Sequence, residues 1–195
     1  MTLAEKPARP LLVGEDNPYC LRDPDMALYP YPDGSAGWRL AVRIMGLPRA
    51  EYLRRFDRVN LCAGRWSAGE ARDRAKDLVS AGTPHRPAIV LLGGKVCRAF
   101  DVEFAPFTLL SRTALARCAV ILPHPSGRSR AWNEPGAFER ARAVLRDAGV
   151  LPPAEEIARI AAEAARPKCS NCGLPKLDNV CPDCGFDRGQ RHAED

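Results

Sequence analysis

The sequence predicts an α/β protein: a three-layer α/β/α sandwich around a mostly parallel, four-stranded central sheet, followed by a small cysteine-rich segment. Short apolar runs, some nearly continuous, alternate along the chain with patterns of helical period. This alternation is typical of a parallel sheet that helices cover on both faces. The chain has 195 residues, of which 46% are hydrophobic, enough for one ordinary domain and an appendage.

The first half of the chain supplies two of the expected strands and one helix. The run P-L-L-V-G-E-D-N-P-Y (10–19) is typical of a short buried strand that ends in turn residues. A proline-rich loop, Y-P-Y-P-D-G, leads into a helix that we expect to stop at Gly46. Residues 56–62 alternate like a strand. The expected buried face of the helix consists of Trp38, Ala41 and Met45.

The second half supplies the other two strands and two helices. Ser67 and Glu70 have the spacing of a capping box, which predicts a helix start. The runs P-A-I-V-L-L-G-G (87–94) and R-C-A-V-I-L-P-H-P (117–125) predict strands covered on both faces. A last helix of this domain should end at Gly149. The apolar stripe after the capping box consists of Ala71, Ala75, Leu78 and Val79.

Three polar clusters lie at the carboxyl ends of predicted strands. They are Glu15-Asp16-Asn17-Pro18-Tyr19, Asn60, and His124-Pro125-Ser126. Binding sites of open α/β sheets lie outside the carboxyl ends of the strands. We therefore expect a pocket at this edge, with His124, fixed between two prolines, as one wall.

The four C-terminal cysteines are the most specific motif of the chain. Two C-x-x-C knuckles, eight residues apart, can close a tetrahedral zinc site, and a segment this short would fold mainly by binding the metal. Disulfides and an iron–sulfur cluster are the alternatives. Four protein ligands indicate a structural rather than a catalytic zinc. The expected ligands are Cys169, Cys172, Cys181 and Cys184.

These patterns divide the chain into four parts. We expect a flexible tail at 1–9, a domain at 10–150, a helical linker at 151–167 and a zinc-ribbon-like segment at 168–195. The ribbon could bind protein, contact phosphates or cap the fold.

The net charge of +5 and the pI near 8.9 permit an anionic partner without requiring one. No apolar run approaches the roughly 20 residues that span a bilayer, and the first residues lack the apolar core of a signal peptide. We expect an intracellular, cytoplasmic monomer in a reducing compartment, without contact to a membrane.

The order of these motifs resembles the uracil-DNA glycosylase superfamily over roughly residues 10–149. The similar segments are the glycine-rich turn after the first strand, the Gly34-Ser35-Ala36-Gly37 helix start, the strand with Asn60, the strand that ends in Gly93-Gly94, and the loop at His124. The resemblance implies a three-layer sandwich that removes a base flipped out of DNA.

The resemblance implies roles for the residues of the first and last motifs. His124 matches the catalytic histidine, which stabilises the charge on the departing base. Asn17 matches the residue that holds the attacking water, but Asp16 could be the actual carboxylate, because the spacing from glycine to proline is one residue longer here. Tyr19 resembles the aromatic residue that excludes a thymine methyl group.

Two further residues are expected to hold the base. Asn60 resembles the asparagine that pairs with the flipped base, since an amide offers both a donor and an acceptor. Taken alone, Asn60 is as well explained as a structural amide at a strand end. The stacking residue is expected in Tyr29-Pro30-Tyr31-Pro32, with Tyr31 our choice.

The loop after His124 resembles the loop that enters the DNA stack, without its usual apolar side chain. Ser126, Arg128 and Arg130 are the expected DNA contacts, with a solvated basic loop as the alternative. Relatives with an iron–sulfur cluster have core cysteines that this chain lacks, so we expect no cluster in the core.

The sequence thus favours a monofunctional DNA glycosylase acting on uracil or another deaminated base. A protein that binds such DNA without cleaving it is the main alternative. An enzyme acting on free nucleosides is a third possibility. The sequence does not fix the base or the strandedness of the DNA.

Overall fold

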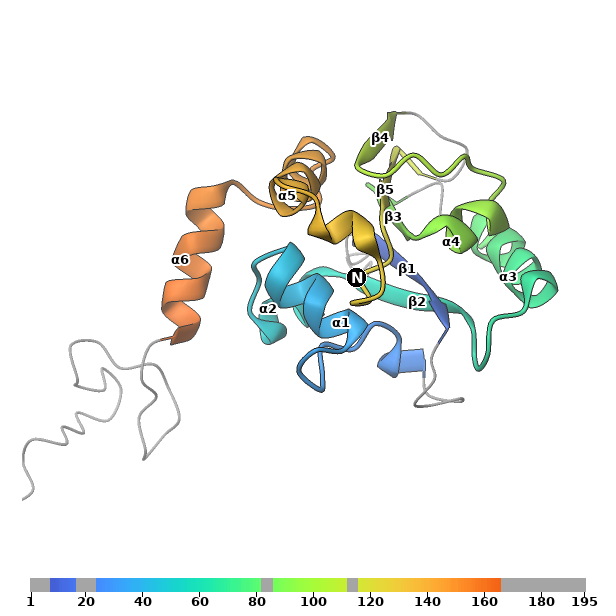
Figure 1. Ribbon diagram of the computed structural model, residues 1–195, viewed down its shortest axis with the longest axis horizontal. Helices are drawn as coiled ribbons and strands as arrows, with labels where there is room; N and C mark the ends of the chain where they lie inside the picture. Colours follow the sequence, from blue (N-terminus) through green and yellow to red (C-terminus); the bar gives the residue numbers. More distant parts are fainter. Residues whose placement is uncertain (1–7, 17–23, 82–85, 112–115, 166–195) are drawn as a thin grey trace, which may run out of the picture. The chain divides into compact units, whose positions relative to one another are not determined.

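The computed structural model of the chain describes residues 8–16, 24–81, 86–111 and 116–165 (Figure 1). The chain divides into two compact units, Met1–Pro152 and Pro153–Asp195. The first unit contains the sheet, and the described part of the second is a single helix, α6 (Ala154–Ala165).

Strands and helices alternate through the first unit. The segments η1 and η4 are 3-10 helices, and η2 is a π-helical segment that continues α1. The order is β1 (Leu11–Asp16), η1 (Pro24–Met26), α1 (Ala36–Trp38), η2 (Arg39–Ile44), α2 (Arg49–Arg55), β2 (Asp57–Cys62), α3 (Ala68–Ser80), β3 (Ile89–Leu92), α4 (Gly94–Ala99), β4 (Thr108–Ser111), β5 (Cys118–Leu122), η4 (Arg130–Asn133) and α5 (Ala137–Asp147).

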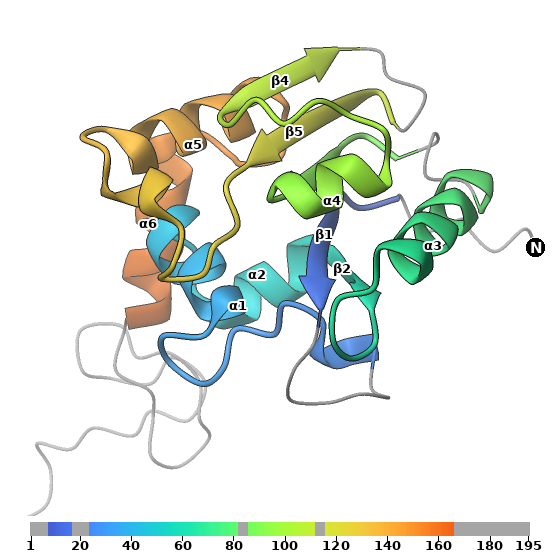
Figure 2. The same cartoon turned by 45° about the vertical axis from the view of Figure 1, so that its right-hand side comes forward.

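The strands form one sheet in the order β2-β1-β3-β5-β4. The pairs β1–β2, β1–β3 and β3–β5 are parallel, so four strands present their carboxyl ends at the same edge. Figure 2 shows α3 and α4 on one side of this sheet and α1, α2 and α5 on the other. The α/β class and the mostly parallel sheet are confirmed, and the layers are compatible with a sandwich.

The described part of the chain contains five strands in this sheet, so the predicted number of four is wrong. The additional strand, β4, lies at the edge and runs antiparallel to β5, with Thr108 opposite Ile121 and Ser111 opposite Cys118. Its residues are half-buried or exposed. An edge strand covered so incompletely lacks the continuous apolar run that identified the inner strands.

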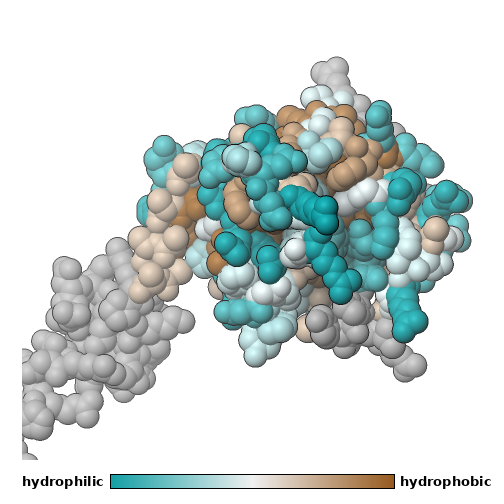
Figure 3. All heavy atoms as spheres, viewed as in Figure 1, coloured by the Kyte–Doolittle hydropathy of each residue, from teal (hydrophilic) through white to brown (hydrophobic). Residues whose placement is uncertain are grey.

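The outer surfaces of the helices are polar. In α3 only Ala71 and Ala75 are buried, and its other side chains are exposed or half-buried. Hydrophilic residues cover much of the face drawn in Figure 3. The pattern agrees with one polar and one apolar side for each covering helix.

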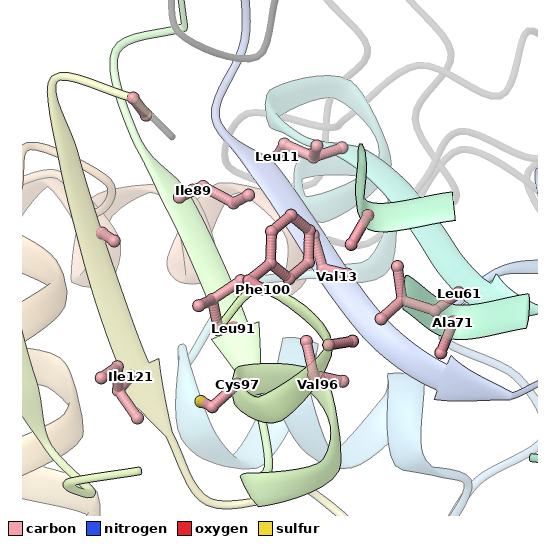
Figure 4. Packing of buried hydrophobic residues seen from close by; sticks show 14 of the residues in the cluster. Leu11, Val13, Leu61, Ala71, Ile89, Leu91, Val96, Cys97, Phe100 and Ile121 are labelled. Atoms are coloured by element: carbon pink, nitrogen blue, oxygen red, sulfur yellow. The ribbon is translucent and has the colours of Figure 1, made fainter. Parts of the chain in front are cut away.

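One face of the sheet packs against α3 and α4 in a continuous apolar core (Figure 4). Leu11, Val13, Ile89 and Leu91 project from the central strands into this core, and Phe100 covers them. At about 25 cal/mol for each Å² of apolar surface buried, such side chains supply the main driving force for this layer.

The opposite face of the sheet is equally well buried. Leu12, Val90 and Leu122 alternate with the residues of the first core and have no exposed surface. Helices α1, α2 and α5 lie on this side, and α5 also packs against β5 and η2. The largest fully buried side chains of η2, α2 and α5 are Leu40, Ile44, Tyr52 and Leu145.

The predicted helix after the proline-rich loop forms, with an unusual second half. Ser35 is its N-cap and accepts a hydrogen bond from the backbone N–H of Trp38 at 3.1 Å. The N–H of Met45 donates to the carbonyl of Leu40, five residues earlier, at 2.9 Å. Of the expected buried face, Ala41 and Met45 are fully buried and Trp38 is half-buried.

The predicted capping box forms in part. The Oγ of Ser67 accepts from the backbone N–H of Glu70, as expected. The carboxylate of Glu70 accepts from the N–H of Ala63, at 3.2 Å. Glu70 therefore fixes the loop before α3 as well as the start of the helix.

The helix of the second unit lies within the predicted linker, and its first described hydrogen bond joins the N–H of Ile157 to the carbonyl of Pro153. In the described residues, no helix combines the length and the apolar character that crossing a bilayer requires.

Candidate active site at the carboxyl edge of the sheet

A cavity of about 800 Å³ lies at the carboxyl edge of the parallel strands. This volume is within the range of roughly 300–1,000 Å³ that is typical of small-molecule sites. We call it the main cavity. It is lined by Glu15, Asp16, Met26, Leu28, Tyr29, Gly34, Ser35, Ala36, Gly37, Asn60, Lys95, His124, Ser126, Gly127, Arg128 and Ser129.

His124 lies two residues after the end of β5 and is held at three points. Pro123 and Pro125 on either side of it are buried. The imidazole Nδ1 accepts a hydrogen bond from the backbone N–H of Ser126 at 3.2 Å. The backbone carbonyl of His124 accepts from the indole Nε1 of Trp132 at 2.8 Å. Both the ring and the backbone of the histidine are therefore fixed.

The surroundings of His124 favour its neutral form. Burial lowers the pKa of His124 below its ordinary value, and the positive charge of Lys95 adds to the lowering. The carboxylates of Glu15 and Asp16 act in the opposite direction, and burial outweighs them. Because Nδ1 is an acceptor, the neutral ring has its proton on Nε2. His124 is therefore equipped to donate one hydrogen bond without being charged.

The two carboxylates at the end of β1 have different partners. Glu15 forms an ion pair with Lys95 at 3.0 Å, and the ammonium of Lys95 also lies 5.4 Å from the ring centre of Trp66. Asp16 forms a hydrogen bond through its backbone carbonyl, which accepts from the side-chain amide of Asn60. An ion pair thus neutralises the carboxylate of Glu15, whereas the carboxylate of Asp16 forms none with the described residues.

Gly93 allows Glu15 and His124 to approach each other. It has a φ of +100°, a backbone conformation that side chains disfavour. A Cβ at this position would lie 3.0 Å from Oε1 of Glu15 and 3.1 Å from Cβ of His124. The glycine after β3 is therefore required both by its conformation and by the space around it.

Only one of the two polar atoms in the Asn60 side chain has a hydrogen-bond partner among the described residues. Its Nδ2 donates to the carbonyl of Asp16 at 3.1 Å, and its buried Oδ1 has no hydrogen-bond partner among the described residues. A side chain at Gly14 would collide with this Oδ1. An unpaired buried acceptor costs about 1–3 kcal/mol, so Asn60 lines the cavity with one polar atom whose hydrogen-bonding capacity the described residues leave unused.

The wall formed by residues 27–29 is fixed by hydrogen bonds to its backbone. Arg58 donates to the carbonyl of Ala27 at 3.0 Å, and the buried hydroxyl of Tyr52 donates to the carbonyl of Leu28 at 3.1 Å. A side chain at Gly37 would collide with the carbonyls of Leu28 and Tyr29. The second glycine of the G-x-A-G motif thus lets the helix pack closely on this wall.

The structure separates the two tyrosines of the proline-rich loop. Tyr31 is 61% exposed and does not line the main cavity, and the guanidinium of Arg49 lies 5.6 Å from its ring centre. Tyr29 does line the cavity, with Arg58 at 5.8 Å from its ring centre. Tyr29 is therefore the aromatic residue of this loop in contact with the cavity.

The three expected DNA contacts also differ in position. Ser126 and Arg128 line the main cavity. Arg130 begins η4, is exposed and does not line it. Asn17, Tyr19 and the four ribbon cysteines lie outside the described residues. Within the described residues, no group of three or more potential metal ligands occurs.

The sequence pattern did not single out Lys95 or Tyr29. Lys95 is the second residue of α4, just after β3, so a search of the segments that follow the strands could have found it. Tyr29 could not be distinguished from Tyr31, because the path of a proline-rich loop has no periodic pattern.

No protein-family model matches this chain, and no curated protein is significantly similar to it. The function is therefore argued from the cavity and from the motifs.

Proposed function

We propose that the chain is a DNA glycosylase-like hydrolase that cleaves the N-glycosidic bond of uracil, or of another deaminated base, flipped out of DNA. The observation that supports this most is the neutral, fixed His124 in the wall of the main cavity. Cleavage leaves negative charge on an oxygen of the departing base. A neutral imidazole N–H can stabilise that oxygen by a hydrogen bond.

Asn60 would select the base. Its Nδ2 donates to a carbonyl oxygen, which fixes the orientation of the amide and leaves Oδ1 as the free acceptor. The Watson–Crick edge of uracil presents an N–H at N3 beside an acceptor at O4, whereas cytosine presents an acceptor at N3. An amide in this orientation therefore favours uracil or a base with a similar edge.

The carboxylates of the main cavity would stabilise the charge on the sugar and orient the attacking water. Positive charge develops on the sugar as the bond breaks, and carboxylates near it lower the barrier. Asp16 lines the cavity without an ion pair to any described residue, so we assign it this role and the orientation of water. Asn17, the neighbouring candidate for holding the water, remains part of the proposal. Tyr19 would exclude a thymine methyl group.

The DNA contacts and the metal are part of the same proposal. Ser126, Arg128 and Arg130 would contact the DNA strand, and Tyr29 would stack on the base. Cys169, Cys172, Cys181 and Cys184 would hold one structural zinc, outside the described residues. Mass spectrometry of the native protein should find one zinc, and Cys169→Ser together with Cys172→Ser should abolish it.

The test uses a labelled oligonucleotide with a single uracil, incubated with the full-length protein and then treated with alkali. We expect strand scission at the uracil and none in a matched thymine oligonucleotide. His124→Ala should reduce the rate by about 100- to 1,000-fold, the usual effect of removing one such donor. Arg74→Gln, an exposed residue of α3 that does not line the cavity, is the control and should retain the full rate.

The same samples separate the alternatives. Binding of the uracil oligonucleotide without scission would replace the enzyme by a non-cleaving binder of damaged DNA. Release of uracil from free deoxyuridine, with no effect on DNA, would favour a nucleoside hydrolase. Absence of binding and of scission would refute the proposal.

A further inference from the structure

A second, smaller cavity of about 160 Å³ lies on the other side of the loop that follows His124. It is smaller than the roughly 300 Å³ at which organic ligand sites begin and far larger than the roughly 10–15 Å³ that one water needs. We call it the minor cavity. It is lined by Arg39, Arg43, Ile44, Pro125, Ser126, Gly127, Ser129, Trp132, Asn133 and Phe138.

The minor cavity is built to attract an anion. Two guanidinium groups, two hydroxyl groups and one amide line it, and no carboxylate is among its lining residues. Arginine matches the geometry of phosphate oxygens by paired hydrogen bonds. Hydrophilic residues gather over the middle of the face in Figure 3, where the segment between β5 and α5 runs. A cavity of this size and charge fits one phosphate group.

The two arginines are held in different ways. The Nε of Arg39 donates to the carbonyl of Gly34 at 3.1 Å. A Cβ at Gly127 would lie 3.0 Å from Nη2 of Arg39, so only glycine admits the guanidinium so closely. Arg43 is exposed, and its side chain forms no hydrogen bond or ion pair with the other described residues. Arg43 is therefore available to a ligand, beside a guanidinium that is already fixed.

The helix that supplies both arginines is anchored to α5. Arg142 donates from Nε to the carbonyl of Ile44 at 2.8 Å and from Nη2 to the carbonyl of Arg43 at 2.9 Å. These bonds occupy carbonyls at the C-terminal end of η2. The backbone at Arg43 is thus fixed by contacts within the protein.

The two cavities have a common wall. Ser126, Gly127 and Ser129 line both of them. A ligand that enters both cavities would have an anionic group in the minor cavity. A few bonds away, a second group of the ligand would lie beside His124 in the main cavity. A nucleotide within a DNA strand has this form, with a base on one side of the sugar and phosphates on the other.

We propose that the minor cavity binds a backbone phosphate that flanks the flipped nucleotide, with Arg39 and Arg43 as its ligands. The proposal rests on the proposed function, in that the main cavity holds the base. It assigns a binding role to two helix residues outside the loop in which we expected the DNA contacts.

The test measures affinity for an oligonucleotide with a single 2′-fluoro-deoxyuridine, which resists cleavage because the fluorine disfavours positive charge on the sugar. Affinity is measured over a range of salt concentrations. Each phosphate contact contributes about 0.7 to 0.9 to the slope of log affinity against log salt. We expect Arg43→Gln to reduce the slope by about this amount, and Arg74→Gln on α3 to leave it unchanged.

A neutral methylphosphonate then replaces the phosphates near the uridine, one at a time. One linkage should weaken binding by the wild-type protein about tenfold, as expected for the loss of a charge-assisted hydrogen bond. The same replacement should have no further effect in Arg43→Gln. Equal slopes for Arg43→Gln and Arg74→Gln, or equal losses at every linkage in both proteins, would overturn the proposal.

A third measurement distinguishes a DNA phosphate from free phosphate. Inorganic phosphate should compete only weakly, because it lacks the contacts of the base. If it instead raises the Tm of the wild type and not of Arg43→Gln, while the DNA slopes stay equal, the cavity binds free phosphate and the assignment to DNA fails. Failure of the proposed function has a different signature: no uracil excision, with the slope difference retained.

Discussion

The Nδ1 of His124 and the backbone N–H of Ser126 lie 3.2 Å apart and form a hydrogen bond. The bond closes a turn of three residues at the end of β5 and fixes the tautomer of the imidazole. Protonation of the ring would place a second N–H against this backbone donor. The bond is therefore compatible only with the neutral histidine.

The stability of the protein should depend on the charge of His124. Its pKa is lowered in the folded state by burial and by Lys95, against the effects of Glu15 and Asp16. The unfolded chain therefore binds the proton more readily, and stability should fall as the pH drops from the ordinary value of 6.5 through the lowered pKa. Excision should decline only at the lower end of this window, where His124 of the folded protein becomes protonated. Urea unfolding of the wild type and of His124→Gln between about pH 5 and about pH 8 tests this; equal pH dependence in both would contradict it.

Gly93→Ala should destabilise the protein by about 1–3 kcal/mol, because the residue has a φ of +100° and a new Cβ would press on Glu15 and His124. Excision should fall as His124 is displaced. Gly69→Ala is the matched control, since nothing lies within 4 Å of its added Cβ and the residue is helical. That change should raise stability by about 0.5–1 kcal/mol. Thermal unfolding of both variants tests this prediction. An unchanged Tm for Gly93→Ala would refute the close approach of Glu15 and His124 to Gly93.

Asn60→Ala should separate stability from activity. The variant loses the hydrogen bond to Asp16 and also removes a buried acceptor without a partner. These effects oppose each other, so the free energy of unfolding should change by no more than about 1 kcal/mol. Excision should fall by about 100-fold or more. Urea unfolding and single-turnover kinetics on the uracil oligonucleotide measure the two quantities. A large loss of stability with full activity would show that Asn60 is a structural amide.

Tyr29 and Tyr31 should respond differently to truncation. Tyr29 lines the main cavity and Tyr31 is 61% exposed outside it. Stacking of one base on an aromatic ring contributes about 1–3 kcal/mol. Tyr29→Ala should therefore weaken binding of the uracil oligonucleotide by about tenfold or more, and Tyr31→Ala by less than about twofold. Fluorescence anisotropy provides the comparison, and the opposite order would restore Tyr31 as the stacking residue.

Most of the sheet could be predicted from the sequence because inner parallel strands are apolar on both faces. Ile89–Leu92 is buried at every position, and few structures other than an inner strand account for such a short, continuous apolar run. The edge strand Thr108–Ser111 could not be predicted, since an edge strand is covered on fewer sides. The π-helical turn at Arg39–Ile44 was also missed, because a helix of this kind has the same apolar stripe as an ordinary one.

Within the site, residues at strand ends could be predicted and residues on loops could not. The structure brings Asp16, Asn60 and His124 into one cavity, as the rule for parallel sheets predicts. The ion pair between Glu15 and Lys95 joins positions 80 apart in the chain, and no local sequence pattern predicts it. The approach of Arg39 to Gly127 depends in the same way on how helix and loop pack.

The bonds from Arg142 to the carbonyls of Arg43 and Ile44 connect residues 98 and 99 positions apart. Synthesis proceeds from the N-terminus, so η2 leaves the ribosome long before Arg142 of α5, which anchors it. Contacts this distant in sequence form late in folding. The nascent chain therefore acquires the complete minor cavity only after α5 has emerged, and a protein released early would lack the anchor of η2 even with β1 to β3 complete. The minor cavity with its anchored helix is therefore a property of the finished domain.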